Sequence, residues 1–185
     1  MSEILLVTGN AHKLGEWQRM MPSIITLEST DIDLDELQSD DPLEIVTDKV
    51  KRAYEAVGKP VIVEDVSAGL VDLGGLPGPF IKFFIKRLGQ DALYQLAGRK
   101  DGAAAVVSCS AAYYDGETLL SVRGDVNGTV VAPRPGSTFG FDVTFVPDGY
   151  TQTYAEMDSS VKDSLSHRAI AISLLLKEME EKKLI

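Results

Sequence analysis

Two neighbouring carboxylates, Glu64 and Asp65, follow the apolar run Pro60–Val63. We expect this run to be a buried strand that ends at the two acids, where a carboxylate is costly unless it is paired or bound to a cation. Magnesium prefers one or two carboxylates together with phosphate oxygens and water. Asp65 is therefore a candidate metal ligand or water activator, and the alternative is that it caps the turn after the strand.

A short loop, Thr8-Gly9-Asn10, lies between an apolar run and a helical pattern and could receive an anion. Glycine lets the backbone approach a ligand closely, and the N-terminus of a helix offers unpaired amide N–H groups. Lys13, in the first helical turn, could add a positive charge. The alternative is a plain turn with a solvated lysine, because the loop matches neither the phosphate-loop motif nor the dinucleotide fingerprint.

The C-terminal half contributes aromatic and basic residues. The segment Phe139-Gly140-Phe141-Asp142 has two aromatic rings that could stack on a purine or pack in a core. His167 and Arg168 begin the last helical pattern, where positive charge opposes the helix dipole. We therefore expect these two residues to serve a ligand, and we expect loss of Arg168 to change thermal stability little.

Three more charged residues are weak candidates when each is taken alone. Glu36 lies in an acidic connection, Lys49 lies one position off the apolar stripe of a helix, and Lys82 lies in an apolar helix start. Acids in loops and lysines on helices are usually solvated, and a lysine among apolar residues can extend its amine to water.

The patterns around these residues predict an α/β protein, with helices alternating with strands early and a β-meander in the second half. Asp41 is expected to cap a helix that has Pro42 in its first turn and Glu44 in a capping box. Expected helices cover residues 11–21, 42–57, 80–88, 91–96 and 166–181, and expected strands cover 4–7, 24–27, 60–63, 103–114, 118–123, 125–131 and 143–146.

Composition limits the classes of protein. The chain has 185 residues, 44% hydrophobic and 25% charged, which suits one domain over residues 1–185. Its net charge of -10 argues against a nucleic-acid partner but leaves room for a small anion in a local cluster of lysines. The first apolar run is too short for an export signal or a membrane span, so we expect no membrane association and a cytoplasmic location. The lone Cys109 is expected to be a small buried hydrophobe.

In order and spacing, these segments resemble the inosine triphosphate pyrophosphatase family, also called the Ham1 family, over residues 4–176. The resemblance implies an elongated α/β fold of two lobes, with a mixed sheet flanked by helices and a nucleotide cleft between the lobes. It also implies a homodimer. The implied activity is Mg²⁺-dependent hydrolysis of inosine, deoxyinosine and xanthosine triphosphates to the monophosphate and pyrophosphate, which cleanses the nucleotide pool.

The resemblance also assigns roles to residues. Asp65 matches a metal ligand or catalytic base, and Glu36 matches a metal ligand. Val66 stands where the family usually has Ser or Thr, and Val143 and Asp163 also depart from the usual pattern. The residues at substrate-binding positions are Thr8, Gly9, Asn10, Lys13, Lys49, Val66, Lys82, Phe139, Gly140, Phe141, Asp142, Lys162, His167 and Arg168.

Discrimination among bases would depend on one atom. Inosine and xanthine carry an acceptor oxygen at position 6, where adenine carries a donor amine, and donors from His167 and Arg168 would pair only with the oxygen. Such a site can reject the mismatched base by up to about 10⁴–10⁵. Three alternatives stay open: a pyrophosphatase for another nucleotide, as in Maf-like proteins, a regulator that binds inosine phosphates without hydrolysis, and a structural interaction module.

Overall fold

The computed structural model describes residues 2–137 and 139–185, which fold into two compact units. Unit 1 comprises the residues up to Asp65, Cys109–Gly124, and Arg168 to the C-terminus. Unit 2 comprises Val66–Ser108 and Asp125–His167. The two units are therefore built from interleaved segments of the chain.

In the described part of the chain, seven strands form one sheet in the order β2-β1-β3-β5-β6-β7, and β4 pairs with β3. Strand β1 runs parallel to both β2 and β3, whereas β4 is antiparallel to β3 and β7 is antiparallel to β6. The strands are β1 (Ser2–Val7), β2 (Ile25–Thr30), β3 (Val61–Leu70), β4 (Pro77–Gly78), β5 (Ala103–Tyr114), β6 (Leu119–Val130) and β7 (Phe145–Pro147).

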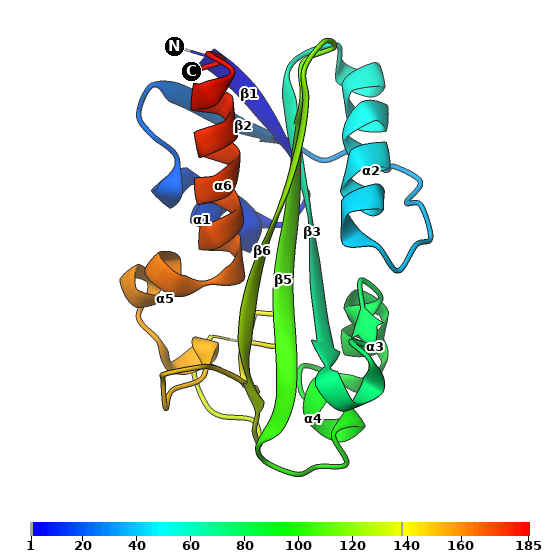
Figure 1. The fold of residues 1–185 in the computed structure, drawn as a ribbon, viewed down its shortest axis with the longest axis vertical. Coiled ribbons are helices and arrows are strands. Elements are labelled where there is room, and N and C mark those ends of the chain that lie inside the picture. The colour runs from blue at the N-terminus through cyan, green and yellow to red at the C-terminus, as the bar shows by residue number, and fades with distance from the viewer. Residues whose placement is uncertain (1, 138) are drawn as a thin grey trace. The chain divides into compact units, whose positions relative to one another are not determined.

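Unit 1 has helices on both sides of its strands. Helices α1 (Ala11–Met20) and α6 (His167–Glu181) lie on one side, and α2 (Pro42–Val57) lies on the other (Figure 1). Asp41 caps α2 by accepting the N–H of Leu43 at 2.8 Å, as predicted. The apolar face of α2 packs on β1, β3 and β5 through a cluster of Val7, Val46, Val50, Ala53, Val61, Val63 and Ala112.

Unit 2 has a core rich in aromatic residues. Phe141, Phe145 and Tyr154 pack with small residues of β3, β5 and β6. Helices α3 (Ile81–Leu88) and α4 (Ala92–Leu96) lie on one side of the strands, and α5 (Ser159–Leu165) lies on the other (Figure 1). Two short 3₁₀ helices complete the unit: η1 (Val71–Leu73) and η2 (Tyr154–Glu156).

The mixed α/β architecture with helices flanking a sheet is confirmed, and β5 has the predicted bounds. Strand β3 is different, because it continues through Glu64 and Asp65 to Leu70. The prediction that both acids end a strand is therefore wrong, and its physical reason lies in the side chains that neutralise Glu64, described below. The two strands predicted over residues 118–131 are the single strand β6.

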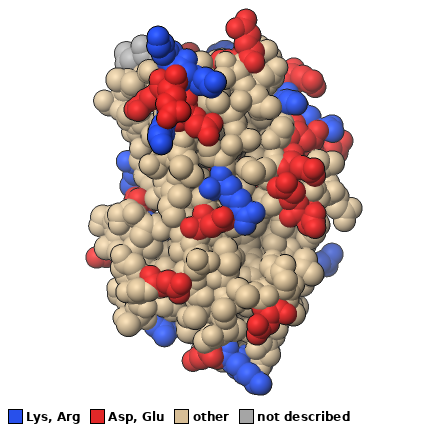
Figure 2. Space-filling view, viewed as in Figure 1, with Lys and Arg blue, Asp and Glu red and all other residues tan. Residues whose placement is uncertain are grey.

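None of the described helices combines the length and the apolar composition that a membrane crossing requires. On the face shown in Figure 2, Lys and Arg side chains are interspersed with Asp and Glu side chains. The described residues on this face therefore form no continuous basic surface.

Candidate active site

The loop Thr8-Gly9-Asn10 connects β1 to α1 and is held by its own side chains. The Thr8 hydroxyl accepts the N–H of Asn10 at 3.1 Å. Asn10 is the N-cap of α1, and its Oδ1 accepts the N–H groups of His12 at 3.0 Å and Lys13 at 3.3 Å. The prediction of unpaired N–H groups at this helix start is therefore wrong for His12 and Lys13, because the cap already satisfies them.

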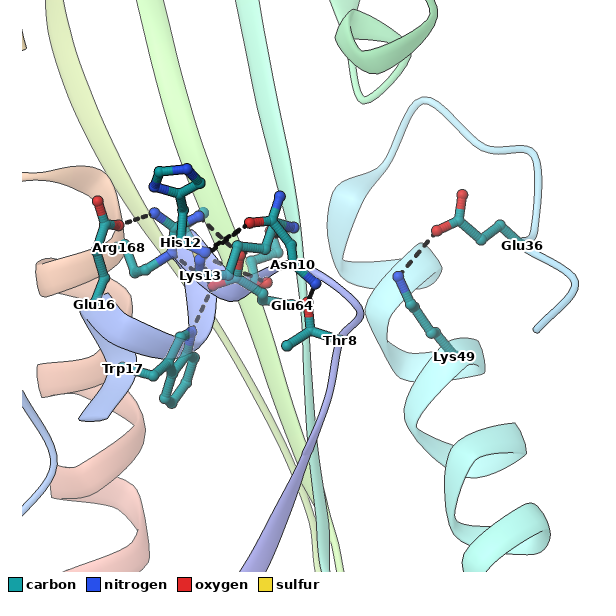
Figure 3. Close-up of polar contacts among 12 residues, drawn as sticks. Thr8, Asn10, His12, Lys13, Glu16, Trp17, Glu36, Lys49, Glu64 and Arg168 are labelled. Carbon is teal, nitrogen blue, oxygen red and sulfur yellow. Dashed lines mark hydrogen bonds and ion pairs between the residues drawn. The ribbon is translucent and has the colours of Figure 1, made fainter. Parts of the chain in front are cut away.

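The Glu64 carboxylate is the centre of a buried charge network (Figure 3). It accepts a forked pair of hydrogen bonds from Arg168, from Nε to Oε2 and from Nη2 to Oε1, both at 2.8 Å. Lys13 Nζ lies 3.0 Å from Glu64 Oε1, and the Trp17 indole N–H donates to Oε2 at 2.6 Å. These partners lower the pKa of Glu64 well below its usual value, against the opposing effect of burial.

Arg168 is only 1% exposed and also donates through Nη1 to Glu16. Its guanidinium is thus shared between two buried carboxylates, which raise its pKa well above the usual value despite the opposing effect of its burial. The prediction that Arg168 gains little from its structural surroundings is therefore wrong, and we expect its loss to lower stability. The contribution of Arg168 to the free energy of folding depends on these two carboxylates far more than on the dipole of α6.

A second pair of charges joins Lys49 of α2 to Glu36 in the connection before this helix. Lys49 Nζ is 2.9 Å from Glu36 Oε1, so the acidic connection and the helix are joined at this point (Figure 3). Burial and the nearby charge of Lys13 lower the pKa of Lys49, while Asp65 and Glu64 oppose that shift. An anion bound near both lysines would reduce their repulsion and favour the protonated form of Lys49.

Asp65 is 8% exposed on β3 and lies close enough to Lys49 to favour its protonated form. The predicted residues Thr8, Asn10, Lys13, Lys49 and Asp65 thus belong to the same compact unit, as do Gly9, which lies against the Asp31 carboxylate, and Glu36. Their roles toward a ligand stay predictions.

A magnesium ion implied by the family resemblance can be tested against the donors present. Among the described residues, no group of three or more His, Cys, Asp and Glu side chains is gathered as a metal site. Magnesium does not need such a cage, since it is commonly held by one or two carboxylates with substrate phosphates and water. Asp65 and Glu36 supply hard oxygen donors of this kind, so the donor chemistry fits the ion.

The Phe139–Asp142 segment and Lys162 come together in unit 2. Lys162 Nζ lies 2.6 Å from Asp142 Oδ2, and both side chains are buried. The same amine lies 5.5 Å from the ring centroid of Phe139 and 5.6 Å from that of Tyr154. Gly140 has a φ of 59°, a conformation that favours glycine.

The two phenylalanines of this segment differ in exposure. Phe141 is 4% exposed and packs in the core of unit 2, whereas Phe139 is half-buried. Phe139 is therefore the better placed of the two to stack on a base. His167 is also buried, with its ring stacked on Tyr154 at 5.8 Å and tilted against Phe141 at the same distance.

Two predicted substrate contacts have other surroundings. Val66 packs against the apolar core of unit 2, as suits a side chain without a hydroxyl group. Lys82 is exposed on α3, where its Nζ lies 5.1 Å from the ring centroid of its neighbour Phe83. Cys109 is fully buried as predicted, and its thiol lies 3.6 Å from Glu64 Oε2. Burial raises the pKa of this thiol well above the usual value.

Sequence reasoning missed Glu64, Glu16 and Trp17 as parts of the network. A local signal was present for two of them, because Lys13, Glu16 and Trp17 are spaced by three and four residues and so share a face of α1. Glu64 is adjacent to the chosen Asp65 in an apolar strand, where a charge requires a partner. Glu44 accepts the Ser39 hydroxyl at 2.8 Å, a contact outside the expected capping box.

Known proteins resemble this chain over almost its whole length. A sequence model described as the Ham1 family matches residues 4–178. The inosine triphosphate pyrophosphatase of Schizosaccharomyces pombe is 36% identical over 185 residues, which are 99% of this chain and 98% of that protein. The inosine triphosphate pyrophosphatase of Yarrowia lipolytica is 38% identical over 182 residues, which are 97% and 96% of the two chains.

Solved structures share the fold. A HAM1 protein from Coxiella burnetii has a TM-score of 0.82 at 24% identity, covering 98% of this chain and all of that one. A nucleoside-triphosphatase, or dITP/XTP pyrophosphatase, from Mycobacterium abscessus has a TM-score of 0.71 at 26% identity, covering 94% of this chain and 98% of its own. The match in sequence and the match in fold lead to one conclusion: the chain belongs to the Ham1 family.

Proposed function

We propose that this protein hydrolyses deaminated purine nucleoside triphosphates (ITP, dITP and XTP) to the nucleoside monophosphate and pyrophosphate. The observation that carries the proposal is that two lysines close enough to repel each other, Lys13 and Lys49, lie in unit 1 with the buried Asp65, whose charge acts on Lys49. The names of the relatives, inosine triphosphate pyrophosphatases and a dITP/XTP pyrophosphatase, support the choice of substrate. Removal of these nucleotides would cleanse the nucleotide pool, and a cytoplasmic location follows from that role.

The chemistry is hydrolysis of the phosphoanhydride between the α- and β-phosphates. Water adds to the α-phosphorus, the bond to the bridging oxygen breaks, and pyrophosphate leaves. Asp65 would accept the proton of the attacking water, and a positioned general base of this kind contributes about 10²–10⁴ in rate. Lys13 and Lys49 would balance the charge of the phosphates. Their Coulomb attraction to the phosphates is stronger in a half-buried site than in water.

Magnesium is proposed as the cofactor, held by Asp65 and Glu36 together with phosphate oxygens. When bound, the ion would neutralise phosphate charge and fix the orientation of the triphosphate. Glu36 now pairs with Lys49, so this carboxylate would have to be shared between the lysine and the ion. Phe139, Asp142, Lys162 and His167 are proposed to contact the base.

The test is release of pyrophosphate from inosine, xanthosine, guanosine and adenosine triphosphates, with and without Mg²⁺. We expect fast release from the first two, slow release from adenosine triphosphate, and dependence on the ion. A protein that binds inosine phosphates without releasing pyrophosphate would be a regulator. Preference for guanosine triphosphate would identify a pyrophosphatase of a different specificity.

Replacement of Lys13 by Ala should weaken triphosphate binding in a salt-sensitive way and leave the base preference intact. Lys13 is assigned to the phosphates, which all nucleotides share, and Arg168 still neutralises Glu64 after the change. The measurement is kcat/KM for inosine and adenosine triphosphates at two ionic strengths. A collapse of the preference for inosine would contradict the phosphate assignment.

We also propose that the protein is a homodimer that uses an apolar surface of unit 2. Val71, Leu73, Leu76 and Phe83 are 53%, 44%, 54% and 55% exposed around η1 and α3. Several large exposed apolar side chains on neighbouring elements are typical of an interface.

Replacement of Leu76 by Asp should therefore convert a dimer to a monomer, as measured by light scattering after size exclusion. Ile24 in unit 1, also 54% exposed, provides the matched control, and Ile24→Asp should leave the dimer intact. A monomeric parent protein, or a dimeric Leu76→Asp variant, would contradict this interface.

A further inference from the structure

Unit 2 contains an ion pair outside the predicted site, Arg134–Glu156, beside the Phe139–Asp142 segment that is proposed to contact the base. Arg134 begins the stretch that leads to Phe139, and its backbone N–H donates to the carbonyl of Val143 at 2.9 Å. The guanidinium Nη1 of Arg134 donates to the carbonyl of Thr151 at 2.7 Å and lies 3.3 Å from Glu156 Oε2. Arg134 therefore joins the start of this stretch to the segment that contains η2.

Glu156 is held firmly at the other side of this contact. Its Oε2 accepts the Thr153 N–H at 2.8 Å and the Thr153 hydroxyl at 3.1 Å, which completes a capping box around η2. The oxygen that meets Arg134 is thus already fixed by the start of η2. A salt bridge between two ordered groups loses less side-chain entropy than one between two flexible ones.

Helix η2 in turn supports the residues proposed to contact the base. The Ser137 N–H donates to the Ala155 carbonyl at 2.9 Å, and the Ala155 N–H donates to the Asp142 carbonyl at 3.1 Å. Gly136 has a φ of 134°, and a Cβ at that position would collide with the Ala155 carbonyl. The backbone of Gly136 and Ser137 therefore lies directly on η2.

Tyr154, the first residue of η2, extends this support to two further side chains. Its ring stacks on the His167 ring at 5.8 Å and lies 5.6 Å from Lys162 Nζ. A small shift of η2 would therefore move Asp142, Lys162 and His167 together. Base discrimination depends on donors and acceptors held at hydrogen-bond distance, so it is sensitive to such a shift.

We propose that the Arg134–Glu156 ion pair is a positioning element for base recognition, which sets the preference for deaminated purines without touching the nucleotide. This inference rests on the proposed function. Both side chains are partly exposed, at 37% and 27%, so the pair itself contributes little to the stability of the fold. Its effect is on the geometry of the base-binding segment.

The test uses Arg134→Ala and Glu156→Gln in the full chain. Glutamine keeps an oxygen that can accept the Thr153 N–H in the capping box but removes the charge that meets Arg134. Arg52 is the matched control, because it forms a comparable exposed pair with Asp48 on α2 in unit 1, with exposures of 48% and 31%. Each variant is assayed for kcat/KM on inosine and adenosine triphosphates, for affinity toward inosine monophosphate by calorimetry, and for thermal stability.

We expect Arg134→Ala to lower the inosine-to-adenosine ratio of kcat/KM about tenfold, below the roughly 100-fold that a 1 Å misplacement can cost. The KM for inosine triphosphate should rise, kcat should change little, and monophosphate affinity should fall in parallel. Glu156→Gln should change the ratio in the same direction but by less, because Arg134 keeps its hydrogen bond to the Thr151 carbonyl. The double variant should be no worse than Arg134→Ala, since that change already removes the ion pair. Arg134→Lys should restore part of the ratio, and Arg52→Ala should match the parent.

A preference that survives in Arg134→Ala and Glu156→Gln would overturn the inference, as would an equal loss on both substrates with unchanged monophosphate affinity. If Arg134→Ala does not fold, Glu156→Gln and Arg134→Lys decide the question on the same measurements. The parent protein separates the two levels of the argument. A parent without inosine-specific hydrolysis would refute the proposed function itself, whereas a selective parent with equally selective variants would refute only the role of the ion pair.

Discussion

Replacement of Asp65 by Asn is expected to reduce turnover of inosine triphosphate by about 10²–10⁴ while the protein stays folded. Asparagine has nearly the same shape as aspartate, so the buried position in β3 can accept it without a cavity. It cannot accept the proton of the attacking water, and it is a weaker ligand for Mg²⁺. The loss should therefore appear mainly in kcat.

The measurement that separates the two proposed roles of Asp65 is nucleotide affinity across a Mg²⁺ titration. A residue that acts only as a base leaves the affinity unchanged, whereas a metal ligand shifts the Mg²⁺ requirement upward in the variant. Asp40, an exposed acid in the connection before α2, provides the control, and Asp40→Asn should match the parent enzyme. Turnover near the parent value in Asp65→Asn would remove this residue from the mechanism.

Features of the fold that depend on neighbouring residues could be predicted from the sequence. The starts of β5 and α2 are predicted correctly, from the apolar pattern of β5 and from the Asp41-Pro42 sequence. Apolar patterns and helix caps depend on residues that are close together in the sequence. The same holds for the bounds of α6, which begins after Ser166 and ends at Glu181. Helix η2 was not predicted, because its capping box encloses only a single short turn.

Features that depend on distant residues could not be predicted in this way. The two acids of β3 predict the end of a strand, because an isolated buried charge is unfavourable. Glu64 is tolerated within the strand because Arg168, 104 residues further along the chain, supplies the compensating charge. Likewise, Arg168 was assigned to a ligand because its partners Glu64 and Glu16 are remote in sequence. Local patterns identify unusual charges, but only the tertiary structure identifies their partners.

Replacement of Arg168 by Ala is expected to lower the free energy of unfolding by about 3 kcal/mol, because it leaves buried Glu64 and Glu16 without their guanidinium partner. For a chain of this length, that loss corresponds to a fall in Tm of roughly 10 °C. Lys13 and Trp17 still contact Glu64, which places the expected effect at the lower end of the range for a broken buried pair. Arg52→Ala, at a surface pair, should leave Tm nearly unchanged.

The dependence of stability on pH provides an independent measurement of the same network. The folded-state pKa of Glu64 lies well below the ordinary value of 4.5, so its contribution is present above pH 4.5 and is lost as the pH falls toward the folded pKa. Without Arg168 that pKa rises, and the variant should lose less stability than the parent on acidification. Adding Glu64→Gln to Arg168→Ala should recover part of the lost stability, because it removes a buried charge that has lost its main partner.

The catalytic effect of Arg168→Ala distinguishes a structural role from base recognition. Arg168 donates to Glu64 and Glu16 through all three guanidinium nitrogens, and Lys13 pairs with the same Glu64. After the loss of Arg168, Lys13 is the cation nearest to Glu64, so its charge is less available to the phosphates. The catalytic efficiency should therefore fall by a similar factor for every triphosphate. A stable variant that instead lost its activity only on inosine triphosphate would return Arg168 to the base, and the Phe139–Asp142 segment would then share recognition with it.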